Sequence, residues 1–433
     1  MIRSLDKWFP GYLVSILRRP RSRPQPCHLM FCLVDHFEPF RGGASTKDAR
    51  GIVGRWAGEY PGMPGGLRDA DGKCPRHTFF YPQEEYDKDC LDQLADICSK
   101  GYGEVEIHLH HRNDTADGLR RKLLEFRDTL RQRHGLLGGD ARGGIRYGFI
   151  HGNWSLCNSR PDGDWCGVNE ELGILSETGC YADFTFPSAP SPTQPRMVNA
   201  IYRSTDTPGK ARAADRGVGV SVCGEVNVGI SNSQCSIPNA EGNAQYSTFN
   251  AQRSSEDKSE AGNPESSSHS ALFPSATEHR TPNTEHFPAS GFRSHPSSLL
   301  LITGPLALDW RRRKWGILPK LENGAISGGN PPSPHRLDLW AAQHIHVQGR
   351  PDWVFVKVHT HGCMAENAAV LLGASMRSAH EYLGSRYNDG REWRLHYVTA
   401  REMHNIVRAA EDGKTGDPGQ FRDYEVASPP YCG

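Results

Sequence analysis

The sequence contains a series of short apolar runs, each of which ends abruptly in polar, Pro or Gly residues. The first run, residues 29–34, is unbroken and is followed directly by Asp35 and His36. A strand that is apolar on both faces is typical of a parallel sheet, because helices cover both of its sides. Runs of the same kind recur at 78–81, 105–107, 147–150, 184–186, 299–303, 353–358 and 395–398. They predict about seven or eight buried strands, the number that a closed β/α barrel uses.

Segments with the spacing of amphipathic helices separate these runs. In residues 89–99, Leu91, Leu94 and Ile97 fall on one helical face, and residues 115–133 repeat the pattern. Helices are also predicted at 169–178, 335–346, 365–383 and 399–411, the last of which begins with the Thr-x-x-Glu spacing of a capping box. Because strands and helices alternate, the chain is predicted to form a parallel β/α barrel of about seven strands.

Residues 203–298 interrupt this alternation. They are rich in Ser, Asn, Glu, Pro and Gly and contain few large apolar side chains, so that they cannot assemble a core. We predict a low-complexity, mostly disordered insertion here, between a first part of the barrel at 27–202 and a second part at 299–412. A basic N-terminal segment, 1–26, and a C-terminal tail, 413–433, complete the predicted organisation.

The charge balance and the cysteine content indicate which binding partners and which cellular compartment are expected for this chain. Lys+Arg and Asp+Glu number 50 each, so the chain lacks the positive field of a general nucleic-acid binder. The 12 cysteines include no C-x-x-C pair, which favours free thiols in a reducing compartment. We find no pattern of a secretion signal or a transmembrane segment and expect a cytoplasmic protein. The basic and aromatic N-terminal segment suggests a weak peripheral contact with an anionic membrane surface.

Ionisable residues follow several predicted strands at their carboxyl ends, where β/α barrels carry their active sites. These residues are Asp35, His36 and Glu38 after the first strand, His108, His110, His111 and Asp114 after the third, His151 and Asn153 after the fourth, and His359 and His361 after the seventh. In each His-x-His pair the alternation of a strand directs both imidazoles the same way. Imidazole and carboxylate groups hold divalent ions at catalytic sites. The pattern predicts a metal site, with zinc as the expected ion and cobalt or nickel as alternatives.

Several of these residues have a simpler interpretation. Asp114 fits equally well as the N-cap of the helix that starts near Thr115. The basic stretch 311–314, between Trp310 and Trp315, fits either a solvated turn or a clamp for an anionic or sugar substrate. The coincidence of His or Asp at three separate strand ends favours the metal site.

The order of these features resembles the polysaccharide deacetylase superfamily, also called the NodB-homology or carbohydrate esterase family four group. Residues 33–37 take the place of its Thr-Phe-Asp-Asp-Gly motif, 110–114 that of its His-x-x-x-His motif, and 358–361 that of its last His motif. The family's Arg-x-Pro is missing from residues 149–154. The resemblance implies that Asp35 is the general base and that His359 or His361 is the general acid. It also implies a set of metal ligands, namely His36, His108, His110 and Asp114.

The resemblance implies a metal-dependent hydrolase that removes an acyl group from a carbohydrate, at a carbon–nitrogen bond other than a peptide bond or at an ester. His151, Asn153, Trp154 and Trp310 are then the expected substrate-binding residues, because aromatic rings stack on sugars. A glycoside or phosphoester hydrolase would use the same metal. A catalytically silent barrel that binds glycans, or scaffolds polysaccharide biosynthesis, would explain the missing Arg-x-Pro, but the His pairs favour the enzyme.

Overall fold

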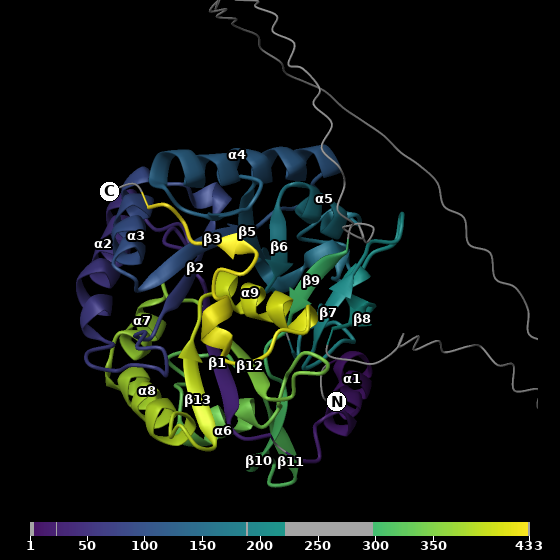
Figure 1. Cartoon of the computed structure of the whole chain (residues 1–433). Coiled ribbons are helices and arrows are strands. Elements are labelled where there is room, and N and C mark those ends of the chain that lie inside the picture. Colours follow the sequence, from purple (N-terminus) through teal and green to yellow (C-terminus); the bar gives the residue numbers. More distant parts are fainter. Residues whose placement is uncertain (1–3, 23, 188, 221–297, 432–433) are drawn as a thin grey trace, which may run out of the picture. The chain divides into compact units, whose positions relative to one another are not determined.

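A mostly parallel β-sheet forms the centre of the described part of the chain, which comprises residues 4–22, 24–187, 189–220 and 298–431 of a computed structural model (Figure 1). In spatial order the strands are β12 (Trp353–Thr360), β1 (Cys27–His36), β2 (His77–Pro82), β3 (Gly103–Leu109), β5 (Ile145–His151), β6 (Cys180–Asp183), β9 (Leu299–Ile302), β7 (Ile201–Ser204) and β8 (Val218–Gly219). β13 (Trp393–Tyr397) pairs with the first half of β1, and β2 pairs with its last residues. The α/β class and the large parallel sheet agree with the sequence prediction.

The hydrogen-bonded sheet does not close into a barrel within the described residues. The outer edge of β12 bonds to loops instead, since the N–H of Phe355 donates to the carbonyl of Ile345 (2.8 Å) and that of His359 to Gly324 (3.1 Å). The strands also exceed the predicted seven. The additional ones include the antiparallel β7 and β8, the pair β4 (Gly138–Asp140) and β14 (Val426–Ala427), and the hairpin of β10 (Ala307–Lys314) and β11 (Leu318–Glu322).

Helices cover both faces of the sheet. α2 (Thr46–Glu59), α3 (Lys88–Ser99), α4 (Ala116–His134), α5 (Glu171–Glu177), α6 (Pro334–Ala341), α7 (Ala365–Leu371) and α8 (Ala374–Tyr387) pack on one face, and α9 (Ala400–Glu411) crosses the other (Figure 1). The sheet has a hydrophobic core on each face. Phe31 and Leu33 of β1 belong to the core that α2 to α8 cover, and Cys32 and Val34 belong to the core that α9 covers. This double burial explains the unbroken apolar run of the sequence.

Most predicted helices are present, with differences at their bounds. Residues 365–383 form two helices, because Gly373 adopts an extended conformation and caps α8. The capping box at the start of α9 is present, with Thr399 and Glu402 satisfying each other's backbone N–H groups. The strand predicted at 184–186 lies instead at Cys180–Asp183, as β6, which ends before the predicted residues. α1 (Leu5–Leu17) and α2 were not predicted.

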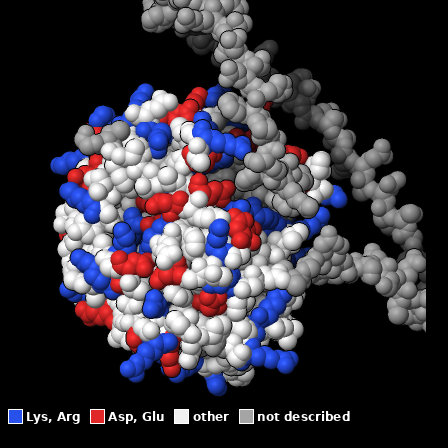
Figure 2. Space-filling view, viewed as in Figure 1, with Lys and Arg blue, Asp and Glu red and all other residues white. Residues whose placement is uncertain are grey.

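The N-terminal segment is part of the fold. α1 buries Trp8 and Tyr12 against Ala189, Val198 and Leu306. No helix among the described residues has both the length and the apolar character that a membrane crossing requires. On the face shown in Figure 2, which carries α9, acidic and basic side chains are interspersed, as the equal charge totals of the sequence suggest.

The predicted insertion falls mostly on residues 221–297, which lie outside the described residues. Its beginning, 203–220, contains the 3-10 turn η5 (Ala213–Asp215) and β8, which pairs with β7. The nine cysteines in the described residues are free thiols, in agreement with the sequence prediction, and all but Cys74 are buried.

A buried network of ion pairs holds the start of α9 against the sheet. Arg76 and Arg422 both pair with Glu402, while Arg401 pairs with Glu104 at 2.8 Å. Burial alone would raise the pKa of Glu402, but the guanidinium groups of Arg76, Arg422 and Arg401 outweigh burial and lower the pKa from 4.5 to about 2. The ionised carboxylate therefore contributes to stability.

We expect Glu402→Gln to lower the free energy of unfolding by about 3 kcal/mol at pH 7, because each unit of pKa shift corresponds to about 1.4 kcal/mol. The pKa is lower in the folded than in the unfolded chain, so this stabilisation is present above about pH 4.5 and is lost as the pH falls towards 2. Urea unfolding at pH 7 and at pH 3 measures the effect. The gap between the two proteins should narrow at pH 3, and an equal gap at both pH values would contradict the assignment.

Candidate metal centres

Four imidazoles surround the carboxylate of Glu38 at the carboxyl edge of the sheet. His36 is the last residue of β1, His108 lies near the end of β3 with His110 just beyond it, and His361 follows β12. β1 and β12 are neighbours, and only β2 separates β1 from β3. Because parallel strands end at one edge, these residues converge although they lie far apart in the sequence.

Distances within this Glu38 cluster are those of a ligand set. Oε1 of Glu38 lies 3.2 Å from Nε2 of His108 and 3.4 Å from Nε2 of His110. The rings of His36 and His361 are stacked, with centroids 4.6 Å apart. The donor atoms form two groups that share Glu38, one with His36 and His361 and one with His108 and His110, and within each group they lie within 4.8 Å of one another.

Hydrogen bonds on the far side of two rings fix their orientation. Nδ1 of His108 donates to the carbonyl of Ile150 (2.8 Å), and Nδ1 of His110 lies 2.5 Å from Oε1 of Glu84. In each case the bond leaves Nε2 facing Glu38. A carbonyl or carboxylate behind a ligating imidazole is the usual outer shell of a metal site, because it sets the tautomer and the ring direction.

The protonation states also suit a cation. Burial lowers the pKa of His36 well below its ordinary value, and burial likewise lowers the pKa of His361. Burial alone would raise the pKa of Glu38, but contact with His108 and the nearby imidazoles outweigh it and hold that pKa at about 2. At His110 the contact with Glu84 outweighs burial and raises the pKa of the ring. The cluster therefore contains an ionised carboxylate and, at His36 and His361, imidazoles whose lowered pKa favours the neutral form that binds metal.

The rim of the Glu38 cluster is partly open to solvent. The side chain of His110 is 25% exposed, and Arg41, which pairs with Glu38, reaches the surface. Glu85 accepts the N–H of Phe40 at 2.8 Å, and burial raises its pKa to about 7. A carboxyl group that titrates near neutral pH thus lies beside the cluster.

A second group of ligating side chains lies next to the first. It comprises His111, His151, Cys166 and Glu171, all of which are buried, and we call it the His111 cluster. Oε1 of Glu171 is 3.2 Å from Nε2 of His111, and Oε2 is 3.4 Å from Sγ of Cys166. The two clusters are adjacent because His110 and His111 are consecutive in the chain.

The structure brings together four residues that the sequence singled out, His36, His108, His110 and His361. Asp35 is separate from them: it lies on the opposite face of β1, where Oδ2 contacts Nε2 of His77 (2.8 Å) and Oδ1 accepts the N–H of Gly362 (2.6 Å). Both of its carboxylate oxygens are therefore already engaged.

The remaining predicted residues are dispersed. Asp114 lies outside the Glu38 cluster and pairs with Lys122 at 2.8 Å, next to His111. His151 is fully buried in the His111 cluster and does not reach the surface, where a substrate would bind. His359 faces the ring of Trp154, with centroids 6.2 Å apart, and Asn153 is exposed. Trp310 is exposed on β10.

Sequence reasoning noted Glu38 and His111 but gave neither a role in the site, and it missed Cys166 and Glu171. One available signal was the spacing of His36 and Glu38, since residues two apart on a strand share a face. Cys166 lies in a loop with no periodic pattern, so nothing in its surroundings indicated that the fold returns it to His111.

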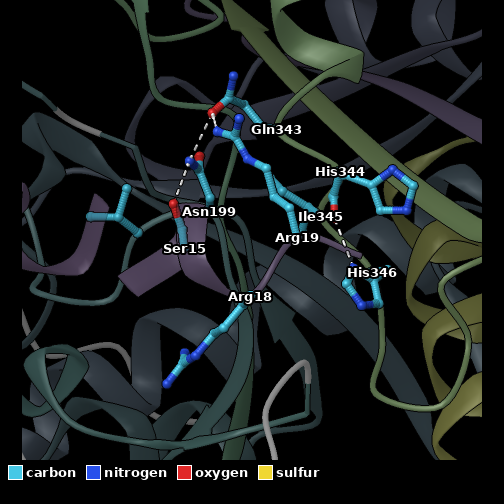
Figure 3. Close-up of a pocket in the computed structure, with 9 residues that line it drawn as sticks. Ser15, Arg18, Arg19, Asn199, Gln343, His344, Ile345 and His346 are labelled. Atoms are coloured by element: carbon cyan, nitrogen blue, oxygen red, sulfur yellow. Dashed lines mark hydrogen bonds between the residues drawn. The ribbon is translucent and has the colours of Figure 1, made fainter. Parts of the chain in front are cut away.

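The pocket in Figure 3 is separate from both clusters. It is lined by residues of α1 and of the loops around Asn199 and Gln343, and its volume is about 20 Å³. Asn199 bonds to Ser15 and to Gln343, and Arg19 also bonds to Gln343. This volume is about that of one water molecule, so the pocket is too small for a sugar.

No protein-family model matches the chain, and no curated protein matches it significantly. The resemblance to the polysaccharide deacetylase superfamily therefore stays a prediction that rests on the motifs of the sequence. The donor atoms, their burial and their arrangement at the edge of the sheet are the properties from which a function has to be inferred.

Proposed function

We propose that this chain is a metal-dependent hydrolase that removes acyl groups from a carbohydrate, with its active centre at the Glu38 cluster. The observation that carries the proposal is the carboxylate of Glu38 among four imidazoles from three strand ends. Two of these imidazoles are held by hydrogen bonds so that Nε2 faces Glu38. Imidazole nitrogens that face a carboxylate are well placed to share a divalent cation with it.

The donor set fits zinc or a similar divalent ion. Glu38 with His36 and His361, or Glu38 with His108 and His110, supplies the three protein ligands that catalytic zinc sites use. When bound, such an ion polarises a carbonyl and lowers the pKa of water, from about 15.7 towards 7 in favourable cases. His110 and Arg41 lie where the cluster meets solvent, so a substrate would approach from their side.

The other roles belong to residues at the rim. Glu85 is suited to exchange a proton near neutral pH, because burial raises its pKa to about 7. Asp35, the base that the family resemblance implies, instead supports the backbone beside His361 through the N–H of Gly362. Trp154 is partly exposed next to His359 and offers a ring face for a sugar.

Metal removal and substrate screening test this proposal together. The purified protein is loaded with zinc and incubated with oligosaccharides that carry N-acetyl or O-acetyl groups, and acetate release is measured. We expect release with at least one of these substrates, loss of release after chelation, and recovery when zinc, cobalt or nickel is restored. Release that persists after complete removal of the metal would contradict the proposal.

A glycan-binding or scaffolding role is the second candidate. It is favoured by the position of Asp35, which is hydrogen-bonded to His77 and Gly362 and leaves the cluster without the base of the predicted family. The same samples distinguish the two candidates. Binding of an oligosaccharide to the zinc-loaded protein without acetate release from any N-acetyl or O-acetyl substrate would support the scaffold and exclude the hydrolase.

A further inference from the structure

We propose that the His111 cluster is a second metal site, at which His111, His151, Cys166 and Glu171 bind a structural zinc ion. Each side chain offers one ligand atom, and these atoms lie within 4.8 Å of one another. Of the ligating groups found among the described residues, this one alone contains a thiol. Two imidazoles, a thiolate and a carboxylate are all ligands that zinc accepts.

The distances agree with a tetrahedral arrangement. Zinc bonds of 2.0–2.3 Å place neighbouring ligand atoms about 3.3–3.6 Å apart. Oε1 of Glu171 lies 3.2 Å from Nε2 of His111 and 3.5 Å from Nε2 of His151, while Oε2 of the same carboxylate lies 3.4 Å from Sγ of Cys166. The contacts from the Glu171 carboxylate to the other three residues thus have the lengths found between ligands of one ion, and one ligand atom from each residue lies within 4.8 Å of the others.

The nitrogen atoms of His151 provide an independent observation. Nδ1 donates to the carbonyl of Gly152 at 2.5 Å, so Nε2 of the neutral ring carries a lone pair. This Nε2 is buried, has no hydrogen-bond partner and faces the carboxylate of Glu171. Two electron-rich atoms facing each other in a dry environment repel, whereas a cation between them removes the repulsion.

His111 lies between two carboxylates. Nε2 faces Glu171, and Nδ1 lies 3.3 Å from Oδ2 of Asp114 without a hydrogen bond. With an ion at Nε2, the single N–H belongs to Nδ1 and points towards Asp114, which is the outer shell common at zinc sites.

The site joins a long irregular loop to the rest of the fold. Between β5 and α5 the chain has little regular structure, and Trp154, Cys157 and Trp165 adopt positive φ angles. The carbonyl of Cys166 accepts the N–H of Asp114 at 3.0 Å, and a Cβ on Gly167 would lie 2.5 Å from the same backbone nitrogen. An ion held by four protein ligands leaves no open position, so its role is to hold this loop in place.

The inference concerns structure and does not depend on the proposed activity. The second site would also help to position the Glu38 cluster, because His110 directly precedes His111 in the chain. The ring of His110 packs closely on Gly152, the neighbour of His151, and a Cβ added at Gly152 would lie 2.1 Å from a carbon of this ring. The ion at the His111 cluster thus fixes both segments that hold His110.

Cobalt spectroscopy of the full chain tests the inference. Cobalt replaces the bound metal, and a thiolate ligand then gives a near-ultraviolet sulfur-to-cobalt charge-transfer band. We expect this band in the unmodified protein and in Glu38→Gln, since neither group at the Glu38 cluster contains a cysteine. Cys166→Ser should lose the band and about one equivalent of zinc per chain. Cys180→Ser, a change at another buried cysteine, should keep both.

Zinc X-ray absorption on the unmodified protein provides a measurement that needs no variant to fold. A sulfur scatterer at about 2.3 Å is expected in the zinc-loaded chain. Scattering from nitrogen and oxygen alone, or a charge-transfer band that survives in Cys166→Ser, would overturn the second site. Neither result would bear on the hydrolase, whose failure would appear only as missing acetate release.

Discussion

Glu38→Gln is expected to reduce metal affinity at the Glu38 cluster by more than about 100-fold and to abolish any metal-dependent hydrolysis. The change keeps the size of the side chain but removes the only carboxylate that both groups of ligands share. Loss of an outer-shell partner alone costs about 10- to 100-fold in metal affinity, so loss of the central ligand should cost more. Metal titration of the apoprotein measures the effect.

Two further carboxylates provide graded controls. Glu84 bonds to Nδ1 and to the backbone N–H of His110, so Glu84→Gln should weaken binding by about 10- to 100-fold without removing a ligand. Glu59 lies on the surface of α2 and, within the described part of the chain, pairs only with Arg55, so Glu59→Gln should have no effect. Equal affinities for Glu38→Gln and Glu59→Gln would rule out the Glu38 cluster as a metal centre.

Arg336→Met is expected to lower the free energy of unfolding by about 3–5 kcal/mol, the largest effect on stability that we predict. The guanidinium is buried and makes two hydrogen bonds to Glu322, at 2.8 and 2.9 Å, and others to the carbonyls of Asn330 and Pro331. It also lies over the ring of Trp340. Without it, the carboxylate of Glu322 remains buried without its cationic partner.

A double substitution separates the buried charge from the lost packing. Glu322→Gln combined with Arg336→Met removes both charges, so it should be less destabilising than Arg336→Met alone. Urea unfolding of Arg336→Met, Glu322→Gln, the double variant and the unmodified protein gives the four free energies of a double-mutant cycle. If the double variant loses as much free energy of unfolding as the two single variants lose together, the two side chains have no coupling energy and the prediction is wrong.

The fold could be predicted from the sequence wherever burial imposes a regular pattern. Residues 29–34 are apolar throughout because both faces of β1 are covered, and Thr399 and Glu402 indicate the start of α9 through a local hydrogen-bond pattern. The hairpin of β10 and β11 escaped prediction because its strand from Ala307 to Lys314 is largely exposed and basic. Whether the sheet closes could not be predicted either, because closure depends on pairing between strands that are distant in the sequence.

The candidate site could be predicted only in part, for a similar reason. The pairs of His residues at strand ends indicated the edge of the sheet, and His108 and His110 do converge there with His36 and His361. The role of Asp35 depended on which face of β1 it occupies. His36 and Glu38 share the cluster face, so alternation places Asp35 on the other one. The roles of Cys166 and Glu171 could not be predicted, because their positions depend on the path of the irregular loop before α5, which tertiary contacts determine.

The position of β1 has a consequence for how the chain is made. His28 pairs with Trp353 along one edge of the strand and with Arg394 along the other, and both partners belong to the last quarter of the sequence. While the ribosome synthesises the protein, only the last residues of β1 can pair early, with β2, and the first half of the strand keeps both edges open until β12 and β13 have emerged. A nascent chain that stops before β12 would expose these edges to other molecules, so premature termination should yield aggregates rather than a smaller folded protein.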